Sequence, residues 1–489
     1  MNGENSALLT DFYSLTMAQG YWKRKMNHRA VFEMFFRSQP FGGGFSVFAG
    51  LGTLLENLAS FRFSSDDLAY LAGLGIFEDG FLDYLKDFRF SCSLWAMEEG
   101  TIVFPNEPLI RIDGDLIECQ LIEAMLLNTV NFQSLIATKT ARVWLASGKG
   151  AILEFGLRRA QGPDGGVSAS RAAFIGGAAG TSNVLAGKKF DIPVFGTMAH
   201  AWVMAWPSEE EAFRAYAEIY PDKTTFLIDT YDTLKSGVVN AIKVGKELAA
   251  KGKGFGVRLD SGDIHYLSVE VRKRLDAAGL PDAAISVSNE LDESIIQALT
   301  DAHAPINSWG VGTRMVTGGG DSAFTGVYKL AASEESDGSL RAAMKFSDNP
   351  GKTTNPGVKQ VWRVKDGEGM CLADVLALEE SSNPDGSRVS EKLEKGGTYT
   401  FWHPSADYRH FTHTVESLPE PLLVKHLANG KAERSASTLK EIRERVANGL
   451  VSFDQSYKRL LNPHIYKVSV TERLRAMKLE QIKKYLGEL

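Results

Sequence analysis

The sequence contains little cysteine. Its 489 residues include three, which lie far apart and form no CxxC pair or His/Cys cluster: Cys92, Cys119 and Cys371. Disulfide scaffolds and structural zinc sites need several cysteines at close, regular spacing. The sequence therefore argues against a disulfide scaffold and against a structural zinc site. It favours a reducing compartment, so we expect the protein to be cytoplasmic.

Long apolar runs are also absent. No stretch approaches the roughly 18 consecutive apolar residues that a membrane-spanning helix requires. The first residues, MNGENSALLTDFY, contain no basic segment followed by an apolar one, as a secretory signal would. We therefore expect a soluble protein that does not associate with a membrane.

The chain has neither an excess of positive charge nor a P-loop. Its 54 lysines and arginines are outnumbered by 60 aspartates and glutamates, which gives a formal net charge of -6. Non-specific nucleic-acid binding requires a basic surface, so we expect no nucleic-acid partner. The pattern GxxxxGK[ST] does not occur, which excludes a P-loop as the holder of a nucleoside triphosphate. Phosphorylated substrates stay possible, because local arginines and backbone amides bind them.

What the sequence does contain is the composition of an ordinary globular protein, 44% hydrophobic and 23% charged. A chain of this length is expected to form two or three domains. Residues 1–135 mix helix-like and strand-like segments, residues 136–370 follow a regular rhythm, and residues 371–489 lose it. We predict an N-terminal α/β domain, a catalytic domain and a C-terminal extension that packs on the other two.

The regular rhythm consists of short apolar runs, each followed by polar or glycine residues and then by a helical pattern. Strands that alternate with helices in this way predict βα units and a parallel sheet. The number of units favours a closed or nearly closed parallel α/β barrel, although spacing alone leaves an open sheet possible. The runs are AILEFG (151–156), IPVFGT (192–197), TFLIDT (225–230), FGVRLD (255–260), AISVSN (284–289) and INSWGVGT (306–313).

Polar side chains gather at the ends of these predicted strands, where α/β barrels carry out their chemistry. A single acid at a strand end is more often a helix cap. A ring of acids with two arginines, a histidine and two glycine-rich turns is harder to explain as caps. The ring comprises Phe155, Arg158, Thr197, His200, Asp229, Asp232, Arg258, Asp260 and Asp263, with the turns 310–313 and 318–320.

Three features of this ring indicate binding or catalysis. The stretch GTRMVTGGGDS suits a phosphate cradle, because glycines let backbone amides approach an anion. The stretch RLDSGD (258–263) suits a sugar diol, a magnesium ion and an anionic ring, although Asp260 or Ser261 could instead cap a helix. His200 alone would more often be structural, but Asp229 ends the adjacent strand and could orient the imidazole for reaction.

Longer motifs extend over most of the chain and fade after about residue 400. In order they are LLTDFYSLTMAQGYW, FEMFFRSQPFGGGFSVFAGL, ECQLIEAMLLNTVNFQSLIATK, EFGLRRAQGPDGG, GTSNVLAGKKFDIPVFGTMAHAW, LIDTYDTL, RLDSGD, GVGTRMVT and FSDNPGKTTNPGVKQVWR. In this combination they resemble the nicotinate phosphoribosyltransferases. That family belongs to the type II phosphoribosyltransferases, which also include the nicotinamide and quinolinate enzymes.

The resemblance implies a fold, an assembly and a reaction. The fold is an α/β barrel with an N-terminal α/β domain, and the assembly is a homodimer whose active sites lie between subunits. The reaction converts nicotinate and phosphoribosyl pyrophosphate to nicotinate mononucleotide and pyrophosphate, the first step of NAD salvage from nicotinate. It is coupled to the hydrolysis of ATP, a co-substrate, through a phosphorylated histidine.

The resemblance also implies a role for individual residues. The phosphohistidine falls on His200, with Asp229 orienting it. The pyridine ring would stack between Phe155 and Tyr13, the latter supplied by the partner subunit. The remaining roles are Arg258 and Arg158 for the nicotinate carboxylate, Thr197 and Arg159 for support in the pocket, Asp260 and Asp263 for the ribose and Mg²⁺, and Gly312 and Thr313 for the 5-phosphate.

The sequence disfavours three rival functions. A nicotinamide enzyme on the same fold would carry an aspartate in the stretch equivalent to GTSNVLAG, where this chain has Ser182 and Asn183 and no acid. A quinolinate enzyme would need a further basic cluster for the second carboxylate. A catalytically inactive, nucleotide-binding relative would have no reason to keep His200, RLDSGD and DTYD together. Nicotinate is therefore the favoured substrate.

Overall fold

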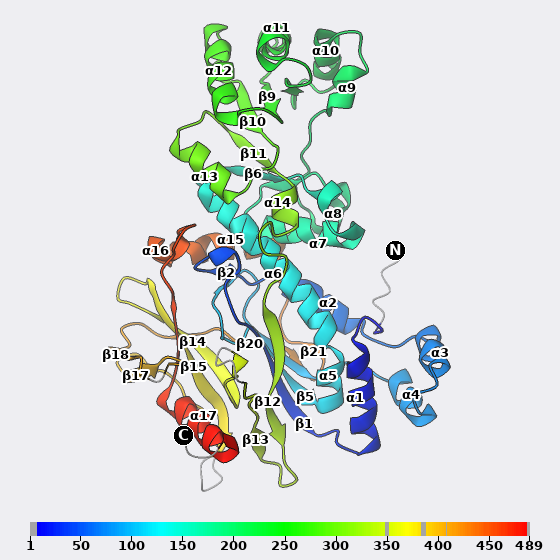
Figure 1. Ribbon diagram of the computed structural model, residues 1–489, viewed down its shortest axis with the longest axis vertical. Coiled ribbons are helices and arrows are strands. Elements are labelled where there is room, and N and C mark those ends of the chain that lie inside the picture. Colours follow the sequence, from blue (N-terminus) through cyan, green and yellow to red (C-terminus); the bar gives the residue numbers. More distant parts are fainter. Residues whose placement is uncertain (1–6, 348–351, 383–387, 407, 487–489) are drawn as a thin grey trace. The chain divides into compact units, whose positions relative to one another are not determined.

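The computed structural model describes residues 7–347, 352–382, 388–406 and 408–486 (Figure 1). Two compact units make up the chain. Unit 1 combines Met1–Leu135 with Ala323–Leu489, and unit 2 is the continuous segment Ile136–Ser322. Unit 2 begins where the sequence places the start of the catalytic domain. The predicted boundary at residue 370 lies inside unit 1, because the chain after Ser322 returns to pair with N-terminal strands.

Unit 1 contains an antiparallel seven-stranded sheet in the order β13-β12-β1-β5-β3-β20-β21. The third strand in this order is β1, whose sequence RAVFEMFF is almost entirely buried. In β1, Glu33 pairs with Arg111 of β5 on one side and with Lys329 of β12 on the other. The strands are β1 (Arg29–Phe36), β3 (Ser93–Ala96), β5 (Ile110–Asp115), β12 (Gly326–Glu334), β13 (Leu340–Ala342), β20 (Val424–Ala428) and β21 (Lys431–Ala432).

A second sheet of unit 1 comes mainly from the C-terminal residues, in the order β18-β17-β22-β15-β14-β19, with β16 beside β15. Its strands are β14 (Val358–Lys365), β15 (Cys371–Ser382), β16 (Arg388–Val389), β17 (Thr398–Trp402), β18 (His410–Thr414), β19 (Glu420–Pro421) and β22 (Lys467–Val470). A short pair, β2 (Ser46–Val47) and β4 (Ile102–Val103), completes the strands of this unit. The C-terminal residues are thus built into unit 1 as a sheet.

The helices of unit 1 lie at both ends of the sequence, and several begin with a side-chain cap. Ser64 and Thr438 each form a reciprocal capping box, with Asp67 and Glu441 respectively. The helices are α1 (Phe12–Lys23), η1 (Pro40–Gly42), α2 (Leu51–Ala59), α3 (Ser65–Gly73), α4 (Asp79–Lys86), α5 (Leu116–Leu121), α15 (Leu439–Val451), α16 (Gln455–Lys458) and α17 (Glu472–Leu486).

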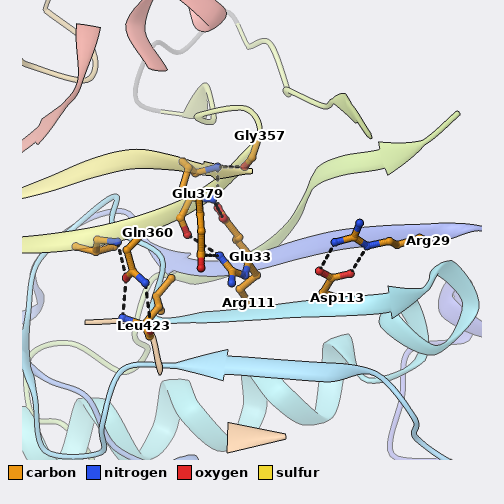
Figure 2. Close-up of polar contacts among 10 residues, drawn as sticks. Arg29, Glu33, Arg111, Asp113, Gly357, Gln360, Glu379 and Leu423 are labelled. Atoms are coloured by element: carbon orange, nitrogen blue, oxygen red, sulfur yellow. Dashed lines mark hydrogen bonds and ion pairs between the residues drawn. The ribbon is translucent and has the colours of Figure 1, made fainter. Parts of the chain in front are cut away.

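Buried charges join the two large sheets of unit 1 (Figure 2). Lys359 of β14 lies 2.8 Å from the Glu33 carboxylate of β1 and donates to the Gly357 carbonyl at 2.6 Å. Arg111 of β5 donates to the Lys359 carbonyl at 2.9 Å and pairs with Glu379 of β15. Burial lowers the pKa of the Lys359 ammonium, and the Glu33 carboxylate opposes this effect. Each buried charge thus has a partner on the other sheet, which fixes how the sheets pack.

Unit 2 contains a parallel six-stranded sheet in the order β7-β6-β11-β10-β9-β8. Five of the six predicted apolar runs contain one of its strands. The exception is 192–197, which makes a single bridge between Val194 and Thr181, since Pro193 has no N–H to donate. The sequence analysis missed the short strand β7. The strands are β6 (Ala151–Glu154), β7 (Gly180–Thr181), β8 (Thr225–Leu227), β9 (Gly256–Leu259), β10 (Ala284–Val287) and β11 (Ser308–Val311).

The strand order of unit 2 follows the chain around a ring. Starting at the Val194 bridge, the order is β7, β6, β11, β10, β9 and β8, so the last strand β11 pairs with the first strand β6. Within residues 136–322, all of which are described, no ladder joins Val194 to β8. The sheet is therefore a barrel with one open seam, which lies between the Val194 segment and β8.

The helices of unit 2 alternate with its strands, as the sequence predicts. Ser208 caps α10 by accepting a hydrogen bond from the Glu211 amide at 3.2 Å, and Gly279 ends the α12 region at φ +79°. The helices are α6 (Glu123–Ala146, which begins in unit 1), η2 (Leu157–Arg159), α7 (Gly162–Ile175), α8 (Val184–Phe190), α9 (His200–Met204), α10 (Glu209–Ile219), η3 (Thr233–Gly237), α11 (Val238–Ala249), α12 (Ile264–Ala277), α13 (Glu293–Asp301) and α14 (Thr313–Val316).

No helix within residues 7–347, 352–382, 388–406 and 408–486 is both long enough and apolar enough to cross a bilayer.

A buried ion triad stabilises unit 2. Glu293, the first residue of α13, lies 2.5 Å from Lys139 Nζ and 3.0 Å from Arg142 Nε, both on α6. All three side chains are at most 6% exposed. Burial acts to raise the pKa of the Glu293 carboxyl, but the two cations hold it below its ordinary value. The carboxylate is therefore required in its charged form.

We expect Glu293→Gln to lower the free energy of unfolding by about 3–5 kcal/mol at neutral pH, because it leaves two buried cations without a counter-charge. Since the folded-state pKa is depressed, this contribution is present above the unfolded pKa and is lost as pH falls through the folded pKa. The difference in the free energy of unfolding between wild type and variant, measured by urea denaturation, should be smaller at pH 4 than at pH 7. Glu270→Gln, in an exposed pair with Lys273, should cost at most about 1 kcal/mol.

Candidate active site

The Phe155 ring lies at the carboxyl end of β6, over the neighbouring strand β11. The Phe155 amide donates to the Val311 carbonyl at 2.9 Å. A Cβ atom added to Gly310 would lie 2.6 Å from the Phe155 ring and 3.2 Å from Ser288 Cβ. Only glycine at position 310 therefore leaves room for an aromatic ring at this edge of the barrel.

Arg258 extends from the end of β9 into the same edge. Its Nη1 donates to Thr197 Oγ1 at 2.5 Å, while its buried Nε has no partner among the described residues. Burial lowers the pKa of the guanidinium, an effect that Asp260 and Asp229 oppose and that Arg158 increases. Arg258 is thus a partly buried cation with an unused donor, suited to bind an anion.

The two arginines of η2 are exposed to solvent. Arg158 is close enough to Arg258 for their charges to repel. The Arg159 side chain makes no hydrogen bond or ion pair within the part of the chain that the structure describes. The structure thus brings Arg158 to the site and leaves the role of Arg159 as a prediction.

His200 is the first residue of α9, and 40% of its side chain is exposed. Its Nδ1 lies 3.2 Å from Thr230 Oγ1, and its Nε2 lies 3.7 Å from Asp260 Oδ2. The expected contact with Asp229 is not made. Asp229 Oδ2 instead accepts hydrogen bonds from the Asp260 amide at 3.0 Å and Ser261 Oγ at 2.6 Å. Thr230, the next residue along the chain, takes the place at the ring that the sequence assigned to Asp229.

The four strand-end acids fall into two groups. Asp232 and Asp263 are helix caps: Asp232 accepts from the amides of Leu234 and Lys235, and Asp263 accepts from the Tyr266 amide at 3.0 Å. Asp260 accepts from the buried Ser288 hydroxyl. Asp229 Oδ1 is buried without a partner among the described residues, although buried acceptors in proteins are usually satisfied. Asp229 and Asp260 therefore have acceptor capacity for a ligand.

Two of the strand-end acids, Asp229 and Asp260, are candidate ligands for a magnesium ion. Among the described residues, no group of three or more His, Cys, Asp or Glu side chains is placed to hold a metal ion. Magnesium usually takes one or two carboxylates and completes its coordination with water and substrate phosphates. Asp260, with the orphan oxygen of Asp229 beside its own amide, fits that requirement, whereas Asp263 Oδ1 is occupied by its cap.

The glycine-rich turn after β11 has the backbone that the sequence predicts. Gly312 precedes α14, and Gly318 and Gly319 have φ values of +75° and +62°. A Cβ atom on Gly319 would lie 3.1 Å from Lys139 Nζ. The sequence carries no signal for Lys139, because a lysine in the middle of a long amphipathic helix resembles any solvent-exposed one.

Comparison with known proteins covers nearly the whole chain. Residues 8–131 match the nicotinate phosphoribosyltransferase (NAPRTase) N-terminal domain, residues 151–317 the NAPRTase family and residues 358–478 the C-terminal domain. A Bacillus subtilis protein named nicotinate phosphoribosyltransferase is 41% identical, over 98% of this chain and 96% of its own. The crystal structure of human nicotinic acid phosphoribosyltransferase matches with a TM-score of 0.83 and 31% identity, covering 96% of this chain and 99% of that one.

The chain belongs to the nicotinate phosphoribosyltransferase family. The predicted fold, a type II phosphoribosyltransferase α/β barrel with additional α/β structure, is confirmed. A nicotinate-nucleotide pyrophosphorylase from Pyrococcus furiosus, 22% identical, shares this fold with a TM-score of 0.69 over 92% of this chain and 97% of its own.

One further feature of this family member is a buried acid, Glu154, that the sequence analysis missed. It is the last residue of β6 and is 1% exposed. Its Oε1 accepts from the Gly156 amide, and its Oε2 accepts from Ser170 Oγ at 2.8 Å and from Thr181 Oγ1. Both oxygens are thus occupied by neighbouring donors. Glu154 thus links the segments of Gly156, Ser170 and Thr181, and its carboxylate is buried among them.

The stretch that distinguishes nicotinate from nicotinamide in the sequence adjoins this network. The Ser182 amide donates to the Glu154 carbonyl at 2.9 Å. Asn183 is buried, and its Oδ1 caps α8 by accepting from the Ala186 amide at 3.2 Å. Neither residue supplies a free carboxylate. Tyr13, the remaining predicted site residue, belongs to α1 of unit 1.

Proposed function

We propose that this protein is a nicotinate phosphoribosyltransferase. It would convert nicotinate and phosphoribosyl pyrophosphate to nicotinate mononucleotide and pyrophosphate, with ATP and water converted to ADP and phosphate, as the first step of NAD salvage from nicotinate. The observation that carries this proposal is the Arg258 guanidinium, which has an unused buried donor beside Arg158. The names of the relatives support the same activity.

The reaction needs positioning more than acid–base chemistry. The pyridine nitrogen is the nucleophile: it forms a bond to C1 of the ribose, and the C1–oxygen bond breaks with its electron pair leaving on pyrophosphate. The Phe155 ring would stack on the pyridine, while Arg258, supported by Thr197, holds its carboxylate. Stacking and a fixed cation hold the reactants in line, which is the main source of rate enhancement in such a transfer.

The polar groups expected to bind the 5-phosphate, the ribose and Mg²⁺ would complete the active site. The backbone of Gly312 and Thr313 would cradle the 5-phosphate, with Lys139 against the following turn. Asp260 would hold Mg²⁺, with Asp229 Oδ1 as a further oxygen, and Asp263 would contact the ribose hydroxyls through the carboxylate oxygen that does not cap α12. When bound, Mg²⁺ would neutralise charge on the departing pyrophosphate.

Nicotinate should be used far better than nicotinamide, because two arginines favour a carboxylate and the stretch at Ser182 and Asn183 supplies no carboxylate to accept from an amide. We expect Arg258→Ala to reduce this preference by about 1.5–3 kcal/mol, the contribution of a charge-assisted hydrogen bond. The measurement is kcat/KM for each base with release of pyrophosphate. Arg214→Ala, in an exposed ion pair of the same unit, should leave the preference unchanged.

Equal use of both bases by the unmodified chain would favour a nicotinamide enzyme instead. No pyrophosphate release with either base would favour an inactive, nucleotide-binding relative.

ATP coupling is proposed to pass through His200. A neutral imidazole nitrogen attacks the γ-phosphorus of ATP, the bond to the β-phosphate oxygen breaks, and ADP leaves. Water later cleaves the N–P bond to release phosphate. The ring needs one nitrogen held by a neighbour so that the other is presented for attack. Thr230 is placed to hold Nδ1, while Nε2 faces the partly exposed Asp260.

We expect His200→Ala to abolish ATP hydrolysis and to leave slow, ATP-insensitive synthesis of nicotinate mononucleotide. With γ-labelled ATP, the unmodified chain should acquire acid-labile, base-stable label. Thr230→Val, which keeps the side-chain shape but removes the hydroxyl, should reduce the labelling rate more than Asp229→Asn does. Label that appears equally in His200→Ala, or never appears in the unmodified chain, would show that the histidine is structural.

The active site is proposed to be shared between two copies of the chain. Leu9, Phe12, Tyr13 and Met17 form an apolar stripe along α1 and the residues before it, and each is at least 37% exposed. Tyr13 and Met17 lie one turn apart on α1, and Leu9 precedes the helix. Exposed apolar patches of this kind mark interaction surfaces. Burial and the nearby Glu123 raise the pKa of the Tyr13 phenol, which keeps it neutral for stacking.

Tyr13→Ala should raise the KM for nicotinate. If the site is shared, mixing Tyr13→Ala with His200→Ala chains under conditions that exchange subunits should restore ATP-coupled activity, because one hybrid site is then intact. Mixing either variant with itself is the control. Complete subunit exchange without recovery would contradict a shared site.

A cytoplasmic location is inferred from the cysteines. The chain has three, with no CxxC pair, which is too few for a disulfide scaffold and fits a reducing compartment.

A further inference from the structure

A buried cation lies beneath the glycine-rich turn that follows α14. The side chain of Lys139, on α6, is 6% exposed. Its Nζ would lie 3.1 Å, and its Cε 3.4 Å, from a Cβ atom added to Gly319. Both Gly318 and Gly319 have left-handed backbone, which other residues rarely adopt. The glycines thus let the turn form and let the ammonium lie close to its backbone.

The same turn is connected to the residues proposed to bind the 5-phosphate. A Cβ atom on Gly319 would also lie 3.4 Å from the Arg314 carbonyl of α14, and the Gly318 amide donates to the Met315 carbonyl at 3.4 Å. The helix α14 has four residues and begins at Thr313. At a rise of about 1.5 Å per residue, its two ends are about 6 Å apart. The ammonium, at the far end of α14, is therefore about one helical turn from the Thr313 amide.

The carboxylate that holds this lysine has a second cation as well. Glu293 of α13 lies 2.5 Å from Lys139 Nζ and 3.0 Å from Arg142 Nε, and the three side chains are almost completely buried. Burying a carboxylate has a desolvation cost that a single well-placed cation can offset. Arg142 already supplies that cation, so the packing of α13 on α6 does not by itself require Lys139. Its position beneath the turn indicates a further role.

Buried charges act strongly on a nearby anion. Two unit charges in a protein site, where the effective dielectric constant is about 20, interact more strongly than at the same distance in water. A phosphate monoester carries a charge of about −1.5 to −2 at neutral pH. The separation of about one helical turn is shorter than the Debye length of about 8 Å in physiological salt. Lys139 therefore attracts a phosphate bound at the start of α14, and Glu293 repels it.

We propose that Lys139 is a positioning residue for the 5-phosphate of the substrate, a phosphorylated sugar. It supports the glycine-rich turn from its buried side, and its charge raises the affinity of the site for the phosphate. Glu293 holds the ammonium in place and lowers that affinity through its opposite charge. The lysine acts through the turn, since its burial keeps it from touching the sugar phosphate. The inference rests on the proposed function, which assigns the 5-phosphate to Gly312 and Thr313.

The test uses ribose 5-phosphate, titrated calorimetrically into the full-length protein. This probe carries the 5-phosphate and lacks the pyrophosphate, so its binding does not depend on the pyrophosphate subsite. Lys139→Met, which removes the charge and nearly keeps the length of the side chain, should weaken binding about tenfold. Glu293→Gln, which removes the opposing charge, should strengthen binding. The double variant Lys139→Met/Glu293→Gln should bind within about threefold of the unmodified chain, because the two changes in charge cancel.

These directions separate a charge effect from damage to the fold. Both single variants lose a buried ion pair, yet their expected effects on binding have opposite signs. Lys139→Arg, which keeps the charge, should bind the probe as the unmodified chain does. If Glu293→Gln does not fold, the comparison of Lys139→Met with Lys139→Arg decides the question. Lys273→Met is the matched control, since it removes an exposed lysine of the same unit that pairs with Glu270, and it should bind normally.

Three results of the titrations would overturn the proposal. They are unchanged binding of ribose 5-phosphate in Lys139→Met, weaker binding in a folded Glu293→Gln chain, and no binding by the unmodified chain. In steady-state kinetics, Lys139→Met should raise the KM for phosphoribosyl pyrophosphate and leave the KM for nicotinate unchanged. An equal rise in both KM values would also overturn it.

A failure of the proposed function would look different. An unmodified chain that releases no pyrophosphate from nicotinate and phosphoribosyl pyrophosphate would contradict the proposed reaction. The titrations with ribose 5-phosphate involve no turnover, so they decide the role of Lys139 in that case too.

Discussion

The pairing of β6 with β11 is the constraint on which the catalytic unit depends. These are the first and last strands of the sheet, and their parallel register sets Trp309 beside Ile152 and Val311 beside Glu154. Because parallel strands place their carboxyl ends at one edge, this pairing brings the aromatic ring after β6 to the glycine-rich turn after β11. Gly310 then becomes obligatory, since any side chain there would occupy the position of the Phe155 ring.

A second set of bonds links neighbouring strand ends around the same edge. Asp229 after β8 binds the Asp260 amide and Ser261 after β9, and Asp260 binds Ser288 after β10. The carboxylates are thus oriented by bonds between strands before any ligand arrives. Such preorganised polar groups act on a substrate without having to reorient during the reaction.

Sequence reasoning predicted the barrel because its signals are local. Each βα unit has its own apolar run, cap and stop, and five of the six runs contain a strand. The predictions that failed concern very short strands or contacts that depend on a single atom. Pro193 reduces one run to a bridge, β7 has two residues, and Thr230 rather than Asp229 reaches the imidazole. Which of two adjacent residues at a strand end faces the imidazole depends on the twist of the backbone, and no residue pattern specifies that twist.

Unit 1 was less predictable because its contacts join distant parts of the chain. Ala30 pairs with Ser333, and Lys359 reaches Glu33 across two sheets. No periodicity within either segment identifies its partner. The same limit applies to Lys139 and Glu154, whose roles follow from tertiary neighbours. The types of residues at the site could be read from the sequence, whereas the bonds between them could not.

The open seam of the barrel has a consequence for motion. The segment after Val194 bonds to β7 on one side, through the Phe195 amide and the Thr181 carbonyl at 2.9 Å, and has no strand on the other. Backbone held by fewer ladder bonds and exposed to water opens more readily than a central strand. His200 lies shortly after this segment, whereas Arg258 and Asp260 follow a strand paired on both sides. The imidazole thus follows a segment at one side of the seam and contacts Thr230 after β8 at the other side, whereas Asp260, which it also faces, follows a strand paired on both sides.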